Sequence, residues 1–579
     1  MKSIHLLGLS VALLSIPAPV ALAQQVVACD PDTFPGGGSS SVVGSTYVPV
    51  DNWVYSAVDR LHALGFVDTA YLGMRPWTRR SIEHMLEATA EKINNSRDNE
   101  EACQIYRKLK EDLETPTGVL NGIRSPRIEL DTTYTRVLGI SGTPLRDSFH
   151  LGQTIINDYG RPYAGGFNDI SGFSARGEAG RFALYFRGEY QHSPDTTGYS
   201  PALASLLSNV DGIPFASNSM QRTIPFGPIQ PINQVRVVEA TLSYLVANHE
   251  ISFGKTDHWL GPAEGGSFAW SNNAENIYGL EIDRTEPLHI PLLSRLTGPF
   301  RYQFFVGSLK GHTVPNDPWI HAEKISFKPT ENLEFGFERS VIWGGKGHEP
   351  ITFDSFLRSF FSVSNVSVAQ KFSRTDPGAR FGTFDFSYRL PYLRRWVTVY
   401  TDSLVHDDVS PISAPRRAGI RAGVYLSRIP GIEHVDFRAE AVSTDPPTSR
   451  SNGGQFLYYE TVQKQGYTNN GLLIGDAIGR EGKGGQAWLT YHISPSEGIV
   501  LSYRNAKASK DFIPGGTTQN SFGVSVVKRI HRDFEIGAWT QIEQWKAPVY
   551  RSGKQVDTST AFQITWYPHK GLAAHTPSQ

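Results

Sequence analysis

Apolar and polar residues alternate along most of the chain beyond about residue 145. In the segment 181–190, the apolar Phe182 and Leu184 fall on one side, and the charged Arg187 and Glu189 fall on the other. A period of two residues predicts β-strands, whose successive side chains point to opposite faces. Many segments run for about ten residues, which suits a tilted membrane strand better than a strand of a soluble sandwich. The same alternation recurs in three further segments: 331–338, 383–390 and 435–441.

The connections between the predicted strands alternate between long and mostly short. In residues 147–567 we count about nine long connections and about eight short ones, which corresponds to about eighteen strands. Long outer loops and short periplasmic turns are typical of bacterial outer-membrane barrels. The fold class that we predict is therefore an all-β transmembrane barrel of about eighteen antiparallel strands, with its apolar side facing lipid and its charged side lining the lumen. Residues 116–146 are predicted to be a linker with an accessory β-segment at 126–137.

Before the barrel, in residues 45–115, the period changes to that of helices. Val54, Val58 and Leu61 fall on one helical face, with Asp51 as a candidate N-cap. Thr78 is a candidate cap for a second helix, and Asp98 with Glu101 forms a capping box for a third helix. The pattern predicts a small three-helix periplasmic domain that caps the barrel. A cell-wall-binding module of the S-layer homology type stays open as an alternative.

The two ends of the chain carry signals of export rather than of folding. Residues 1–23 have a positive Lys2, an apolar stretch and an A-x-A site before Gln24, which together predict a signal peptide. We expect residues 24–44 to be a flexible N-terminal arm and residues 568–579 to be a periplasmic tail. Cys29 can form a disulfide with Cys103; a lipoprotein-type cleavage before Cys29 is the alternative.

The composition excludes several classes of function. The 55 basic residues balance 56 acidic residues, which argues against a nucleic-acid partner. Two cysteines rule out a disulfide-rich scaffold or a cysteine-based zinc cluster, and the 17 histidines show no metal-ligand spacing. The sequence contains no G-x-S-x-G, H-E-x-x-H or P-loop motif. We therefore expect neither a metal nor a cofactor, and no enzymatic activity.

Five segments carry a resemblance to a known family: 48–55 (VPVDNWVY), 75–79 (RPWTR), 157–162 (NDYGRP), 259–262 (WLGP) and 271–274 (SNNA). Together they resemble the Wzi capsule-assembly family over most of the chain. The resemblance implies an eighteen-stranded barrel in the outer membrane of a Gram-negative cell, with a periplasmic helical bundle. It further implies a surface lectin that anchors capsular or other extracellular polysaccharide. The expected partners are this polysaccharide and the lipids of the outer membrane, and the protein is expected to be a monomer.

A lectin holds sugars with aromatic faces and with fixed hydrogen-bonding groups, and several predicted loops offer both. Arg161 is expected to pair with uronic-acid carboxylates or, alternatively, with a carboxylate in the lumen. The loop around residue 265 is expected either to contact glycan or to fold into the lumen, where its Asn side chains would satisfy backbone groups. The spacing of Phe353, Phe356 and Phe360 predicts an amphipathic plug helix. The candidate glycan contacts are Asp257, His258, Trp259, Glu264, Trp270, Asn272, Asn273, Arg161, Tyr163, Trp319 and Trp343.

Two other functions remain possible for the same barrel. A sugar-permeable outer-membrane porin would need an open, water-filled lumen. A surface glycan-processing enzyme would need a pair of carboxylates such as Glu264 with a partner, and spacing in the sequence does not test this.

Overall fold

The structure is a computed structural model in which part of the chain can be described. The described residues are 29, 43–96, 100–113, 119–120, 123–124, 126–214, 221–364, 366–408, 410–448, 453–530 and 533–568. The predicted signal peptide 1–23, most of the predicted arm 24–44 and of the tail 568–579, and the predicted cap Asp98 lie outside the described residues.

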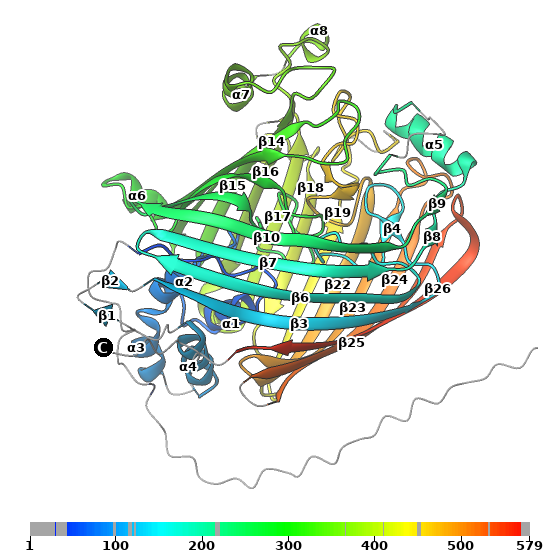
Figure 1. Cartoon of the computed structure of the whole chain (residues 1–579). Coiled ribbons are helices and arrows are strands. Elements are labelled where there is room, and N and C mark those ends of the chain that lie inside the picture. Colours follow the sequence, from blue (N-terminus) through cyan, green and yellow to red (C-terminus); the bar gives the residue numbers. More distant parts are fainter. Residues whose placement is uncertain are drawn as a thin grey trace, which may run out of the picture.

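Eighteen antiparallel strands close into one barrel (Figure 1), so the predicted fold class is confirmed. Each strand pairs with the next barrel strand along the chain, and β26 pairs with β3 to close the wall. The connections alternate between a short-turn end and a long-loop end. The barrel strands are β3 (Arg127–Ser141), β6 (Gly166–Ala179), β7 (Phe182–Ser193), β10 (Ile232–Val246), β11 (His249–Lys255), β12 (Tyr278–Arg284), β13 (Phe300–Ser308), β14 (Trp319–Thr330), β15 (Leu333–Trp343), β16 (Ala379–Arg389), β17 (Val397–His406), β18 (Gly419–Leu426), β19 (Val435–Ser443), β22 (Gly482–Ser494), β23 (Glu497–Ala508), β24 (Thr518–Ile530), β25 (Phe534–Ala547) and β26 (Arg551–Trp566).

The first strand is not where the sequence pattern suggested. The predicted linker 116–146 contains β3, which pairs with β6 and β26 and is therefore a full member of the wall. The segment after residue 147, expected to begin the barrel, belongs to a loop whose only strands are β4 (Arg146–Asp147) and β5 (Gly152–Gln153). Ile128, 84% exposed, marks the outward face of β3, whereas Phe149 is fully buried within the loops. Alternation alone did not distinguish these two environments.

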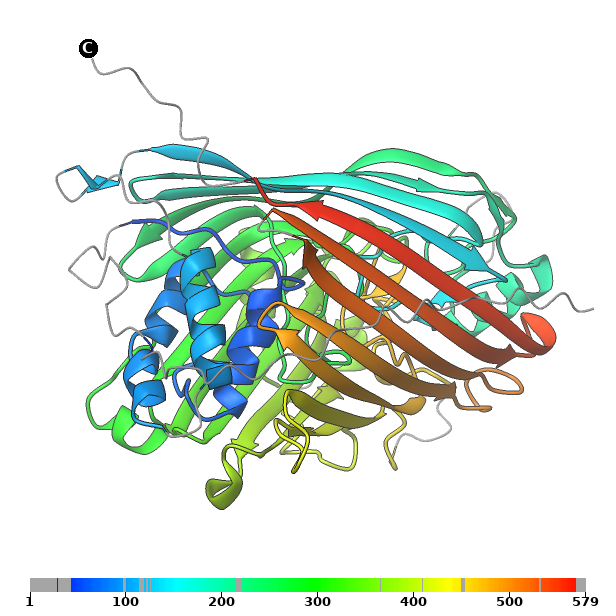
Figure 2. The ribbon, with the colours of Figure 1, turned by 90° about the horizontal axis from the view of Figure 1, so that it is seen from below.

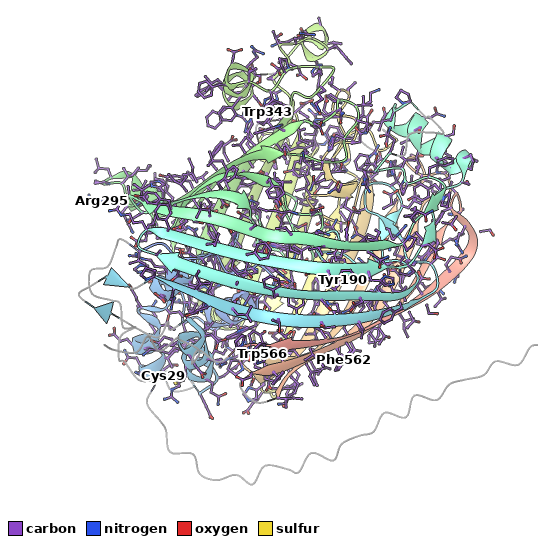
Figure 3. All side chains as sticks on the ribbon, viewed as in Figure 1. Cys29, Tyr190, Arg295, Trp343, Phe562 and Trp566 are labelled. Carbon is purple, nitrogen blue, oxygen red and sulfur yellow. A yellow bond between two sulfur atoms is a disulfide. The ribbon has the colours of Figure 1, made fainter. Side chains whose placement is uncertain are left out.

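The two faces of the wall differ as the alternation predicted. On β7, Phe182 and Tyr190 are exposed on the outside, while Arg187 and Glu189 are buried on the inside. Figure 3 shows Tyr190 and Phe562 on the outer side of the wall. The outside is therefore an apolar belt and the inside is ionic. In the part of the chain that the structure describes, none of the helices is long and apolar enough to cross a membrane.

In the described parts of residues 43–113, four helices rather than the three expected form a helical unit at the short-turn end: α1 (Trp53–Ala63), α2 (Arg79–Leu86), α3 (Thr89–Asn94) and α4 (Glu100–Leu113). The N-cap of α1 is Asn52, whose side chain accepts from the Val54 N–H, and Thr78 caps α2 as its position suggests. A disulfide joins Cys29 to Cys103 on α4. The other elements are α5 (Pro201–Asp211), α6 (Leu293–Thr297), α7 (Phe353–Phe360), α8 (Val368–Lys371), a 3-10 turn (Pro391–Leu393), and the two-residue strands β1 (Val119–Leu120), β2 (Ile123–Arg124), β8 (Thr196–Thr197), β9 (Pro228–Ile229), β20 (Thr468–Asn469) and β21 (Leu472–Leu473).

The helical unit lies across the short-turn mouth of the barrel (Figure 2) and is held there by buried ion pairs. Asp59 on α1 pairs with Arg438 of β19. Asp68 pairs with Arg389 of β16 at 2.6 Å. Inward-facing Glu334 of β15 also accepts the backbone N–H groups of residues 72 and 73 at 2.9 and 3.1 Å. Because an unpaired buried charge is costly, these contacts fix the unit in the mouth.

Replacing Asp68 by Ala is expected to loosen the helical unit. Arg389, whose side chain is fully buried, and Arg394 would both lose the carboxylate that they share. Breaking a buried pair costs about 3 kcal/mol or more. We expect deuterium exchange in α1 and α2 to accelerate while the barrel strands keep their protection. The control is Glu111→Ala, which removes a half-exposed carboxylate that pairs with Lys108 within α4. Equal exchange in both variants would contradict this account.

Candidate functional site

The long-loop end of the barrel is closed by loops that fold into the lumen and bond to one another. The β3–β6 loop meets the β11–β12 loop where the Tyr159 N–H donates to the carbonyl of Asn272 at 2.7 Å. The β11–β12 loop in turn meets the β19–β22 loop where the Ser271 N–H donates to the carbonyl of Ile474 at 2.8 Å. Phe268 and other apolar side chains of these loops form a dry core beneath the rim. The loops therefore form a packed closure.

The β11–β12 loop extends through the lumen as far as the helical unit at the other end. Its Trp259 exchanges two backbone hydrogen bonds with Arg75, at 3.0 and 3.1 Å. Its Asp257 accepts from the Val50 N–H at 3.0 Å and from the Tyr159 hydroxyl at 2.9 Å. One loop thus links the closure at the long-loop end to the closure at the short-turn end.

Most of the predicted glycan contacts in this loop are buried structural groups. His258 stacks on Phe305 with ring centroids 4.1 Å apart, and Trp270 packs edge-on against the same ring. Asn273 accepts from the Asn157 N–H at 3.1 Å and donates to the carbonyl of Leu473 at 3.1 Å. These contacts match the alternative in which the loop folds into the lumen. Asp257, His258, Trp259, Trp270, Asn272 and Asn273 are all buried.

Glu264, by contrast, is exposed within the lumen. Its carboxylate pairs with Arg438 at 3.1 Å, and its backbone N–H donates to Glu440 at 2.7 Å. It therefore faces the side of the helical unit and not the rim at the long-loop end.

Arg161 and Tyr163 lie inside the barrel as well. Arg161 donates to Glu189 on the wall at 3.0 Å and also pairs with Asp158, which is the lumen pairing left open above. The Tyr163 hydroxyl donates to Asp158 at 2.6 Å. Arg136 completes the cluster with a 3.0 Å contact to Asp158. With its guanidinium already paired, Arg161 has no free edge for a uronic acid.

The last two predicted residues, Trp319 and Trp343, point outward from the wall, with their ring centroids 6.3 Å apart. Trp343 is buried because α7 covers it, and Trp319 is 36% exposed. Helix α7 packs on the outer side of the wall: Phe356 lies 6.1 Å from Phe304, and Arg339 donates to the Ser359 carbonyl at 2.7 Å. Figure 1 shows α7 outside the barrel, so the predicted plug helix is a covering helix.

The predicted residues therefore do not form one exposed surface at the long-loop end, and the expectation that they gather there needs correction. All but Glu264 and Trp319 are buried, and Glu264 opens to the lumen. The physical reason is that the hydrogen-bonding groups of a polar, aromatic loop can find partners inside an ionic lumen as well as in solvent.

A different group of residues forms the accessible surface at this end, which we call the loop platform. It comes from four loops: β7–β10, β13–β14, β15–β16 and β19–β22. None of its members belongs to a recognisable motif, so the sequence offered no signal for it. The platform residues are Gln221, Arg222, Lys310, Thr313, Asn316, Lys346, Lys464 and Asn470, and the buried Gln465 lies beneath them.

The platform has a rigid base of amide and backbone contacts. The buried Gln465 side chain donates to the Gln221 amide oxygen at 3.1 Å and to the Thr313 hydroxyl at 2.6 Å. Asn316 and Lys346 exchange two backbone hydrogen bonds, at 3.3 and 2.7 Å. The cross-loop contacts hold the four loops in fixed relative positions.

Above this base the platform is cationic. Arg222 and Lys310 are exposed and lie beside the same glycine, Gly311. The Lys346 side chain is 76% exposed and pairs with Asp317 at 2.7 Å. Cations and amides on a fixed base suit an anionic, hydroxyl-rich ligand. No group of metal-ligating side chains occurs among the residues that the structure describes.

A buried histidine ties the platform loops to the lumen loops. His150 contacts Asp147 at 3.0 Å and Asp211, at the end of α5, at 2.9 Å. Arg480 reaches the other oxygen of Asp211 at 2.7 Å. Burial by itself would lower the pKa of His150, but the two carboxylates outweigh burial and raise this pKa to about 9. His150 is therefore a charged link at neutral pH.

The pKa of His150 predicts how the closure responds to pH. Because the folded pKa lies above the unfolded value of about 6.5, the stabilisation is complete below that value and is lost as the pH rises through 9. We expect deuterium-exchange protection of α5, corrected for the intrinsic rate, to fall between pH 7 and 10. His150→Gln should lower protection at pH 7 towards the level that the unmodified protein shows at pH 10, and should remove the pH dependence. His434→Gln should leave the pH dependence unchanged. A pH-independent α5 in the unmodified protein would count against the charged link.

Three comparisons place this geometry among known proteins. The fold and the packed loops define a large β-barrel whose two mouths are both occupied by its own chain. The family model described as "Capsule assembly protein Wzi" matches residues 136–560, which is more than half of the chain. The chain belongs to the Wzi capsule assembly protein family.

The sequence identity to individual relatives is low. An uncharacterised 55.8 kDa protein in the cps region of Klebsiella pneumoniae is 27% identical over 164 residues, which are 28% of this chain and 31% of that protein. The match thus spans about a third of that curated relative.

Among solved structures, a similar chain is Wzi of Escherichia coli, described as an outer membrane protein involved in group 1 capsule assembly and as a carbohydrate-binding β-barrel. It has a TM-score of 0.63 and 17% identity, over 90% of this chain and 99% of that one, and this likeness shows the fold. OccK5 (OpdH) of Pseudomonas aeruginosa has a TM-score of 0.38 and 9% identity, over 76% and 98% of the two chains, which is too low to bear on function.

Proposed function

We propose that this protein is an outer-membrane barrel that binds surface polysaccharide without catalysis and helps to assemble or attach a capsule. The family supports the role in capsule assembly, and the Escherichia coli Wzi structure, described as carbohydrate-binding, shares the fold. The observation that carries the proposal is the loop platform, a cationic and amide-rich surface on a rigid base, at the end of the barrel that packed loops close.

The apolar belt supports the membrane location. Outward side chains such as Phe173, Leu242 and Phe522 are 45%, 51% and 53% exposed, and water would disfavour so large an apolar surface. In bacterial barrels the short turns are periplasmic and the long loops are extracellular. In this orientation the helical unit and the C-terminus lie in the periplasm, and the loop platform faces the capsule.

Binding at the platform depends on its positive charges and on the many contacts that one polymer makes. Arg222, Lys310 and Lys464 present donors that suit the carboxylates and hydroxyls of an acidic polysaccharide. Each contact is weak because it is solvated. A repeating polymer meets many copies of the protein at once, and avidity makes the attachment stable.

The rival functions have less support. A porin needs a continuous water path, whereas here the lumen loops and the helical unit bond to each other through Arg75 and Trp259. A glycan-processing enzyme would use a carboxylate such as Glu264, but Glu264 is paired with Arg438 inside the lumen, away from the platform.

Charge reversal tests the platform directly. In the double variant Arg222→Glu and Lys310→Glu, we expect purified detergent-solubilised protein to bind capsular polysaccharide about tenfold more weakly, because two attractive contacts become repulsive. Binding is measured by polymer pull-down across a salt series, in which the unmodified protein should lose affinity as salt rises.

The matched control is Lys528→Glu, a reversal at the short-turn end, where Lys528 is exposed and pairs with Glu497. It should bind like the unmodified protein. Cells that carry the double variant should release polymer into the medium. Undiminished, salt-independent binding by the double variant would contradict the platform as the binding surface.

A further inference from the structure

A part of the lumen is left unfilled by the loops and the helical unit. A space of about 550 Å³ lies between the helical unit and the inner wall at the short-turn end, and a space of about 320 Å³ lies along the inner wall of β22–β25. Both are lined by Arg136 and Trp488, so they adjoin at these two side chains, and we call them together the wall groove. Its size is in the range of small-molecule sites.

The two ends of the wall groove have different borders. At the short-turn end it is bordered by Trp53, Ser496 and Tyr567. At the other end the β3–β6 loop closes it, because Arg504 donates to the carbonyls of Gln153 and Thr154 at 3.0 and 2.9 Å. The β3–β6 loop thus lies between the wall groove and the long-loop end of the barrel.

Two tryptophans stand on either side of a floor of small residues. The register places Trp488 opposite Ser502, Ser502 opposite Gly523, and Ser525 opposite Trp539. The two indoles are therefore on strands three positions apart, roughly 14 Å across the sheet. A Cβ at position 523 would lie 2.7 Å from the Ser502 hydroxyl, so glycine at this position keeps the floor low. Flat aromatic faces flanking an open floor suit the C–H surfaces of sugar rings.

The polar groups of the wall groove indicate a neutral ligand. Gln486, Thr490 and Gln541 offer amide and hydroxyl groups along its length. Most of the charged groups that line it are already paired. Arg136 pairs with Asp158 at 3.0 Å, and Arg504 pairs with Glu543 at 2.9 Å. In the larger space, Arg187 pairs with Asp51 at 2.9 Å, and Arg438 pairs with Glu264 at 3.1 Å. An anionic ligand would have to break these pairs, whereas hydroxyl groups can bond alongside them.

We propose that the wall groove is a second carbohydrate site, which binds a neutral glycan segment of about two to four sugars entering from the short-turn end. The proposal rests on the proposed function, since it assigns a glycan as ligand and a periplasmic opening to the groove. The wall groove and the loop platform are separated by the lumen loops. The protein thus binds glycan both at the long-loop end, on the loop platform, and at the short-turn end, in the wall groove.

The test uses purified full-length protein and two probes: intact capsular polysaccharide, and neutral fragments of two to four sugars prepared from it by partial hydrolysis. Fragment binding is followed by saturation-transfer NMR and tryptophan fluorescence. Trp488→Ala and Trp539→Ala should each weaken fragment binding about tenfold, and Trp488→Phe should restore most of it. Gly523→Trp, which fills the floor, should abolish it.

The matched control is Trp566→Ala, which removes a tryptophan from the outward side of β26 and should leave fragment binding unchanged. All groove variants should still bind intact polymer at the loop platform, which also shows that they are folded. If Gly523→Trp does not fold, the comparison of fragment binding by Trp488→Ala and Trp488→Phe still tests the wall groove.

The outcomes separate the two proposals. Fragment binding that is lost in the groove variants while polymer binding persists supports the wall groove. Polymer binding without any fragment binding, or fragment binding unaffected in the groove variants, overturns the wall groove and leaves the proposed function. If the unmodified protein binds neither probe, both are overturned.

Discussion

The structure depends on the requirement that charges inside the barrel find partners. An eighteen-stranded wall encloses a lumen too wide for its own side chains to fill, and its inward face is ionic. Arg421 shows the solution: it lies between Glu440 of the wall, at 2.8 Å, and Asp476 of the β19–β22 loop, at 2.6 Å, with all three buried. A buried charge without a partner costs several kcal/mol. The loops and the helical unit are drawn into the lumen because they supply these partners.

This filling determines what the protein can do. With both mouths occupied, the barrel offers a fixed surface at the long-loop end rather than a channel. The charged link at His150 and the hydrogen bonds of the buried Gln465 hold the loops in place, so a polymer meets a preorganised surface. The same filling is incomplete along β22–β25, where small side chains leave the wall groove. The closure of the barrel and the presence of the wall groove both follow from how the loops and the helical unit fill the lumen.

Much of the fold could be predicted because a two-residue period and alternating loop lengths are local signals. The strand count, the apolar outside and the ionic inside followed from them. Their limit appears at residues 127–156, where a wall strand and a buried loop show similar alternation. The site could not be predicted in the same way. Gln221 and Gln465 meet across 244 positions of the chain, and whether Trp259 faces solvent or the lumen depends on contacts with Arg75 that no local pattern encodes.

Planar-bilayer recording tests the central claim, that the barrel is closed by its own chain, most directly. The purified protein, inserted at many copies per membrane, is predicted to give no stepwise ion conductance at neutral pH. Removal of residues 266–276 from the β11–β12 loop should open a path and give discrete conductance steps. Steady steps from the unmodified protein, of the size given by an open porin of similar strand number, would contradict the claim.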